Sequence, residues 1–113
     1  MSTKQETKKG EVMAIAEVSI VPIGTKSTSL SNYVAGCLKV LENSGLTYEL
    51  HGMGTIIEGD LREIIEVVLK MHEVPFLAGT LRVATSIKVD DRRDKEASAK
   101  SKVTAVLRKR PQP

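Results

Sequence analysis

The chain combines 113 residues, 17 of them basic and 14 acidic, with a hydrophobic fraction of 41%, which predicts one globular domain with a modest core. Aromatic residues make up 3%, too few for a base-stacking platform, so nucleic-acid binding is disfavoured. A single cysteine, Cys37, excludes an intrachain disulfide. With no apolar run of about 18 residues and a polar start, we expect a cytoplasmic protein with no membrane partner.

The first segments in chain order are an arm, a strand and a loop. Residues 1–11 are polar and charged without a period, which predicts a disordered N-terminal arm before a single domain over 12–110. Residues 12–21 are rich in β-branched side chains and predict a strand that stops at Pro22. The face expected to be buried carries Val12, Ala14, Ala16, Val18 and Ile20. Turn residues over 22–29 predict a loop.

A helix and a hairpin follow the loop. Apolar residues recur with helical spacing from Leu30 to Leu41, which predicts an amphipathic helix with Ser29 as its N-cap and Gly45 at its C-terminal end. The stretches "LTYELH" and "MGTIIE" then predict two strands joined near Gly52.

The last third of the chain predicts a helix, a strand and a final helix. Asp60 and Glu63 open the first of these helices, and Pro75 is expected to break or kink it. "LRVATSIKV" alternates as a half-buried strand, and "DDRRDKE" predicts a charged, salt-bridged turn. The final helix is expected to pack through an inner face of Ala99, Val103, Val106 and Leu107.

The order β-α-β-β-α-β predicts an α+β, ferredoxin-like sandwich with an additional C-terminal helix. Its two main helices cover one face of the sheet and leave the other face open. An uncovered sheet rich in aliphatic residues is an aggregation hazard, so we expect self-association, face to face or through a strand edge.

The glycine-rich stretch "HGMGTIIEG" at residues 51–59 does not fit a phosphate loop. The dinucleotide pattern G-x-G-x-x-G would need a third glycine at Ile57, and the Gly-Lys-Ser/Thr of a P-loop is absent. A glycine-softened hairpin explains the stretch without any ligand. The functional interpretation keeps Thr55 and Glu58 as pocket groups.

Other candidate chemistry is sparse. Cys37, His51 and His72 lack the spacing of zinc ligands, and Cys37 falls on a buried helix stripe, so a structural role is favoured. Ser27 and Ser29 are explained by turn formation and capping, although hydroxyls before a helix could also contact a ligand. The sequence therefore predicts no catalytic set, no metal site and no required cofactor.

Four stretches carry a family resemblance: "VSIVPIGTKSTSLSNYV", "SGLTYELHGMGTIIEG", "KMHE" and "IKVDDRRDK". From about Ala16 to Val106 the chain resembles the small thiamine-binding proteins (the YkoF-like group). The resemblance implies a ferredoxin-like fold in dimers and often tetramers, and binding of thiamine or its hydroxymethylpyrimidine moiety without known catalysis. One departure is Gly52, where the family pattern usually has proline, which would stiffen the turn.

The ligand-binding residues expected on chemical grounds are Ser27, Ser29, Met53, Thr55 and Glu58. Glu58 suits the edge of an aminopyrimidine or a thiazolium cation, and Thr55 offers a hydroxyl. Met53 provides an apolar wall without an aromatic ring.

Three functions compete at this point. The first is a non-catalytic carrier or sensor of thiamine or hydroxymethylpyrimidine, acting as a homodimer or homotetramer. The alternative is a structural or regulatory oligomer that binds another small ligand or a protein partner. The third, an RNA-binding module, lacks the aromatic residues that such sheets use.

Overall fold

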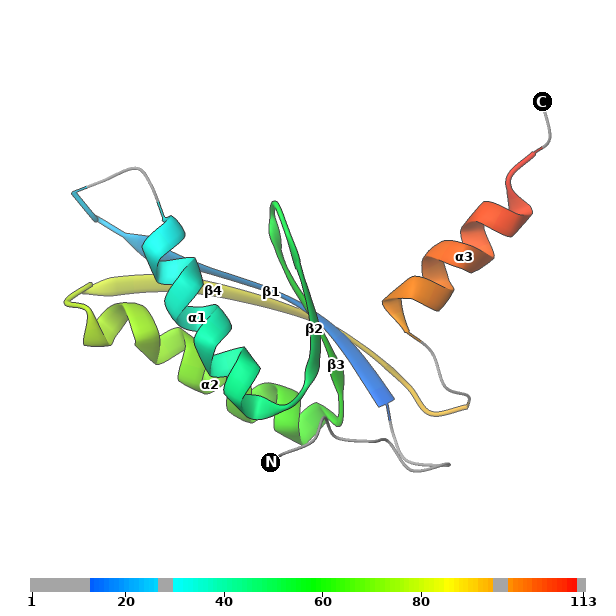
Figure 1. Ribbon diagram of the computed structural model, residues 1–113, viewed down its shortest axis with the longest axis horizontal. Helices are drawn as coiled ribbons and strands as arrows, with labels where there is room; N and C mark the ends of the chain where they lie inside the picture. The colour runs from blue at the N-terminus through cyan, green and yellow to red at the C-terminus, as the bar shows by residue number, and fades with distance from the viewer. Residues whose placement is uncertain (1–12, 27–29, 95–97, 112–113) are drawn as a thin grey trace.

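A computed structural model describes residues 13–26, 30–94 and 98–111 of the chain. The elements are β1 (Met13–Ile23), α1 (Ser31–Ser44), β2 (Thr47–His51), β3 (Gly54–Gly59), α2 (Leu61–Leu77), β4 (Arg82–Arg92) and α3 (Ala99–Lys109) (Figure 1). This order confirms the ferredoxin-like fold with an additional C-terminal helix. The arm predicted at 1–11 and the loop serines Ser27 and Ser29 lie outside the described residues.

The four strands form one antiparallel sheet in the order β2-β3-β1-β4. β1 extends through Pro22 to Ile23, so the prediction that it stops at Pro22 is wrong. The pairing with β3 reaches only Val18, whereas the pairing with β4 continues to Ile23. Pro22 therefore lies where β1 has a free edge, and a strand tolerates proline there because no ladder hydrogen bond is lost on that side.

β4 is longer than the sequence predicts and reaches into the charged stretch. Asp90, Asp91 and Arg92 are paired with β1, so this part of the stretch is strand and not turn. The predicted ion pairs are present: Arg92 Nε lies 2.5 Å from Asp94 Oδ1, and Arg93 Nη2 lies 2.9 Å from Asp91 Oδ2. Each pair joins residues two apart and is exposed, so it adds little stability.

The core lies between one face of the sheet and the two main helices (Figure 1). As predicted for β1, Ala14, Ala16 and Val18 are buried, and Ile57 of β3 joins them. The helices contribute Cys37, Leu41, Ile64, Val67, Val68 and Met71. Neither α1 nor α2 covers the opposite face of the sheet.

α1 begins one residue later than predicted. Its N-terminal boundary residue is Leu30, which provides no side-chain cap, so the N-cap expected at Ser29 is not assigned there. Its C-terminal end is as predicted, because Gly45 adopts the left-handed conformation with a φ of 76°.

α2 runs unbroken through Pro75, contrary to the predicted break. A proline lacks the N–H that would donate to the carbonyl four residues earlier, here that of Met71. The Cys37 thiol of α1 lies 3.5 Å from this carbonyl and donates to it. A contact from the neighbouring helix thus satisfies the carbonyl that Pro75 leaves free.

The N-terminal end of α2 is as predicted. Asp60 is its N-cap, and Asp60 Oδ2 accepts a hydrogen bond of 3.3 Å from the Glu63 N–H.

The crossing of α1 and α2 requires a glycine. A Cβ added at Gly36 would lie 2.9 Å from Val74 Cγ1, closer than real side-chain contacts allow. Gly36 therefore lets the two helices approach at the point where the Cys37 thiol reaches α2.

α3 differs most from its predicted packing. None of its residues is buried, and the residues expected to form its inner face include Val106 at 68% exposure. The helix stands apart from α1 and α2 (Figure 1). The prediction of an inner face packed on the chain's own core is wrong, because β4 carries the chain past the edge of that core before α3 begins.

Two glycines of the hairpin should respond oppositely to alanine. Gly52 has no positive φ and has open space around its Cβ position, so Gly52→Ala should stabilise the protein by about 0.4–1 kcal/mol by restricting the unfolded chain. A Cβ at Gly54 would lie 3.0 Å from the Val18 carbonyl oxygen of β1, so Gly54→Ala should destabilise by about 1–3 kcal/mol. Urea unfolding of both variants tests this pair, and equal effects would contradict it.

Candidate functional site

A cavity of about 660 Å³ lies between α1 and the strands β1, β2 and β3. Its volume is in the range of small-molecule sites. Its apolar lining comes mainly from Val18, Ile20, Leu30, Val34, Leu38, Leu50, Met53 and Met71. Its polar lining comes from Ser19, Ser31, His51 and Thr55. A largely apolar wall with a few polar groups is typical of a site for a small organic molecule.

The cavity exists because α1 packs chiefly against α2 and makes few close approaches to the strands. Val34 and Leu38 belong to the apolar stripe of α1, yet both remain half-buried and line the open space. The sheet offers aliphatic side chains on the other wall. The space that would be filled in a tightly packed sandwich is therefore left free.

Thr55 is the buried polar group of this wall. It is 7% exposed and lies two residues before the buried Ile57 in β3, so both side chains are on the face of the sheet that the helices cover. Among the described residues, the side-chain oxygen that is fully buried without a hydrogen-bond partner is Thr80 Oγ1, and not that of Thr55. Thr55 lines the cavity, where its hydroxyl could form a hydrogen bond with a ligand.

Met53 and Leu50 form the rim of the cavity at the end of the hairpin. Met53 is 91% exposed and Leu50 is 50% exposed, although both line the space. The hairpin tip stands clear of the rest of the sheet (Figure 1). Both side chains therefore lie at the open side of the cavity, and the ligand contact expected of Met53 stays a prediction.

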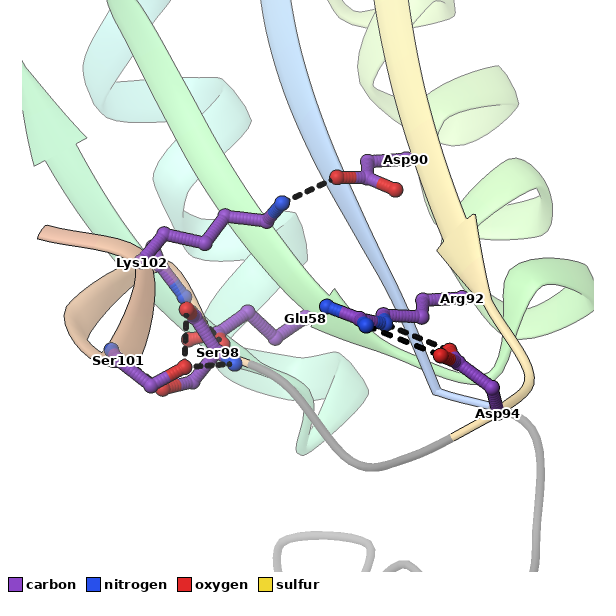
Figure 2. Close-up of polar contacts among 8 residues, drawn as sticks. Glu58, Asp90, Arg92, Asp94, Ser98, Ser101 and Lys102 are labelled. Atoms are coloured by element: carbon purple, nitrogen blue, oxygen red, sulfur yellow. Dashed lines mark hydrogen bonds and ion pairs between the residues drawn. The ribbon is translucent and has the colours of Figure 1, made fainter. Parts of the chain in front are cut away.

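Glu58 lies away from this cavity. It is three residues from Thr55 on one strand, and because successive side chains alternate, the two point to opposite faces of the sheet. Glu58 Oε1 accepts a hydrogen bond of 3.1 Å from the Ala99 N–H at the start of α3 (Figure 2). Within one chain, the expected pocket of Thr55 with Glu58 is therefore not formed, and Glu58 instead holds an N-terminal N–H of a helix.

The serines expected at the site, Ser27 and Ser29, lie outside the described residues. The residues that follow them, Leu30 and Ser31, line the cavity. The ligand contacts expected of Ser27 and Ser29 therefore stay a prediction.

Two polar residues of the lining, Ser19 of β1 and His51 of β2, are not predicted as site residues from the sequence. Ser19 lies in a strand with no motif around it, so only the three-dimensional structure places it at the cavity. The spacing of His51 excludes it as a zinc ligand; in the structure it lines the cavity, and its Nε2 lies 3.6 Å from Glu49 Oε1. The other histidine, His72, contacts β4 through its Nδ1, which lies 2.7 Å from Thr85 Oγ1.

The cavity is electrically neutral in character. Among the described residues that line it, none is Asp, Glu or aromatic. The described parts of the chain contain no group of three or more His, Cys, Asp or Glu that could hold a metal ion. Of the helices described, none has the length and hydropathy that a membrane crossing requires.

A comparison with known protein families identifies the family of this chain. The family model described as "Thiamine-binding protein" matches residues 16–107, which includes every described residue of the cavity wall. The chain belongs to the thiamine-binding protein family. The match confirms the family resemblance from the sequence, and its range agrees with the resembling segment.

Relatives and solved structures extend the family assignment. UPF0045 protein YqgV of Bacillus subtilis is 47% identical over 98 residues, covering 83% of this chain and 94% of YqgV. The crystal structure of hypothetical protein MJ1052 from Methanocaldococcus jannaschii is 39% identical with a TM-score of 0.76, covering 84% of this chain and 96% of that one.

A more distant structure shows the same fold. It is a Thermotoga maritima protein provisionally assigned to thiamine biosynthesis or salvage, with a TM-score of 0.68 at 17% identity, covering 83% of this chain and 98% of that one. At this identity the likeness concerns the fold alone.

The contact between Cys37 and the Met71 carbonyl can be tested by substitution. Cys37→Ala should leave that buried carbonyl without a donor and destabilise the protein by about 1–3 kcal/mol. Cys37→Ser retains a donor and should cost less. Chemical denaturation compares the two, and a serine variant no more stable than the alanine variant would contradict the role of the hydrogen bond.

The same thiol should react slowly. Burial raises the pKa of the Cys37 thiol, so at neutral pH the reactive thiolate is scarcer than in an exposed cysteine. Labelling with a thiol-specific disulfide reagent at pH 7 should be slow in the folded protein and fast after unfolding. Rapid labelling of the folded protein would contradict this burial.

Proposed function

We propose that the protein is a non-catalytic binding protein for thiamine or its hydroxymethylpyrimidine moiety, and that it acts as a carrier or sensor in a homo-oligomer in the cytoplasm. The observation that carries the proposal is the cavity of about 660 Å³, with Thr55, 7% exposed, as the buried polar residue of a largely apolar wall. It lies in a chain of the thiamine-binding protein family. The thiamine assignment of the Thermotoga maritima protein adds support through its shared fold.

The chemistry of the wall suits the pyrimidine ring. An aminopyrimidine is flat and uncharged and carries both donors and acceptors, so a few hydroxyl groups in an apolar cavity can recognise it. Thr55 supplies such a group, and Met53 and Leu50 can cover the ring. The loop serines Ser27 and Ser29 remain part of the proposed site.

The thiazolium cation of thiamine has no carboxylate to meet within this cavity. Taking a cation out of water without a counter-charge is costly, so the cation should stay at the open rim. This favours binding in which the pyrimidine enters the cavity and the rest of thiamine lies outside.

Calorimetric titration with thiamine and with hydroxymethylpyrimidine tests the proposal. Thr55→Val should keep the shape of the cavity and remove one hydrogen bond to the ligand, weakening binding about 3- to 10-fold. Glu58→Gln, on the opposite face of the sheet, is the matched control and should leave binding unchanged. Absence of heat and of thermal shift at millimolar concentrations of both compounds would overturn the proposal.

A further inference from the structure

One edge of β1 is free where the strand lines the cavity. β1 pairs with β4 along its whole length, but its pairing with β3 ends at Val18, which lies opposite Thr55. β3 begins only at Gly54, after the hairpin turn. Among the described strands, the part of β1 beyond Val18 therefore has a partner on one side only. Residues 19–21 of this part line the cavity.

Two observations show which backbone groups face the free edge. The Val18 carbonyl oxygen points toward β3, since it lies 3.0 Å from the position that a Cβ would take on Gly54. The backbone groups of a strand alternate between its two neighbours, so the N–H and C=O of Ile20 face the same side as those of Val18. Pro22 fits this alternation, because it has no N–H and is still paired with β4.

Ile20 lacks the strand residue that would pair with it. Continued by two residues, the register of β1 with β3 places Met53 opposite Ile20. Met53 belongs instead to the hairpin turn, whose tip stands clear of the rest of the sheet (Figure 1). Within the described parts of the chain, no backbone group or side chain forms a hydrogen bond with the N–H or C=O of Ile20 on this edge.

The two backbone groups of Ile20 form a donor and an acceptor side by side. In an antiparallel sheet, a residue in this position both donates to and accepts from the residue opposite. Unpaired groups at a strand edge are a template for any partner that completes the same two bonds. A ligand that does so gains its hydrogen bonds from a backbone that β4 already holds in place.

We propose that the pyrimidine ring binds edge-on to β1, in the place of the missing strand residue, and forms one hydrogen bond with the Ile20 N–H and a second with the Ile20 C=O. An aminopyrimidine fits this position, because its ring nitrogen accepts a hydrogen bond beside an amino group that donates one. The inference rests on the proposed function and assigns its recognition to the backbone of one residue. Met53 then covers the ring from the rim.

Recognition by the backbone selects a class of compounds. Flat heterocycles that carry an amino group next to a ring nitrogen share the required pattern, and a ring without the amino group has only half of it. Among the described residues of the lining, none is Asp or Glu. The amino group therefore has no carboxylate to meet in the cavity, and the Ile20 carbonyl supplies an acceptor.

Hydrogen exchange of single amides, measured by NMR on the full-length protein, tests the edge and its occupation. In the free protein the Ile20 amide should exchange at least about tenfold faster than the amides of Ser19 and Val21, which face β4. Saturation with hydroxymethylpyrimidine should slow the Ile20 amide at least about tenfold and leave the other two nearly unchanged. The analogue with a methyl in place of the amino group has a similar size and should bind at least about tenfold more weakly.

Substitution by proline removes the N–H donor of Ile20. Ile20→Pro should keep the fold, as the native Pro22 does two residues later, and should weaken binding of hydroxymethylpyrimidine at least about tenfold. Ile20→Val is the matched control, because valine has a volume close to that of proline and keeps the N–H. Its affinity should stay within about threefold of the parent protein. Val21→Pro removes an N–H that faces β4 and should lower the melting temperature by more than about 10 °C.

Three results would overturn the inference. If hydroxymethylpyrimidine binds without slowing the Ile20 amide, the ring is recognised elsewhere in the cavity and the proposed function stands. Equal affinities of the proline and valine variants would lead to the same conclusion. An Ile20 amide that exchanges as slowly as its neighbours in the free protein would show that the edge is already closed. Absence of binding in calorimetry would overturn the proposed function as well, which separates the two failures.

Discussion

The contact between α1 and α2 is the constraint on which the rest of this structure depends. Pro75 removes one donor from the interior of α2, and the thiol of Cys37 replaces it at the Met71 carbonyl. Gly36 allows the helices to come close enough for this contact. Because α1 is bound to its neighbouring helix, it does not need to settle onto the strands, and the cavity beneath it survives as part of the folded state.

The two ends of β3 serve different purposes on different faces of the sheet. At one end, Thr55 points into the cavity between the sheet and α1. At the other end, Glu58 points to the uncovered face and holds the first turn of α3. One short strand thus connects the cavity on one face of the sheet with the start of α3 on the other, although the two share no side chain.

Much of this architecture follows from patterns in the sequence. The strand alternation of residues 14–18, the hairpin near Gly52 and the left-handed Gly45 are local properties, and local rules predict them. Pro75 escaped those rules because its compensation comes from Cys37, 38 residues earlier in the chain. The cavity could not be predicted because periodicity indicates which side of α1 is apolar but not how far that side stands from the strands.

The amphipathic pattern of α3 follows from its sequence, whereas its lack of burial in the described part of its own chain does not. A sequence shows that a helix has an apolar side; it does not show whether that side meets the same chain or another one. Glu58 illustrates the same limit at the level of a single residue, since a carboxylate at a strand end suits a ligand and a helix N-terminus equally well.

Gly36 gives this fold a means of evolutionary change. It sets the spacing of α1 and α2 without lining the cavity. A larger residue there would meet Val74 and press α1 away from α2, which would alter the size of the cavity while every residue of its lining stayed the same. Evolution could therefore reshape the cavity through a position outside it.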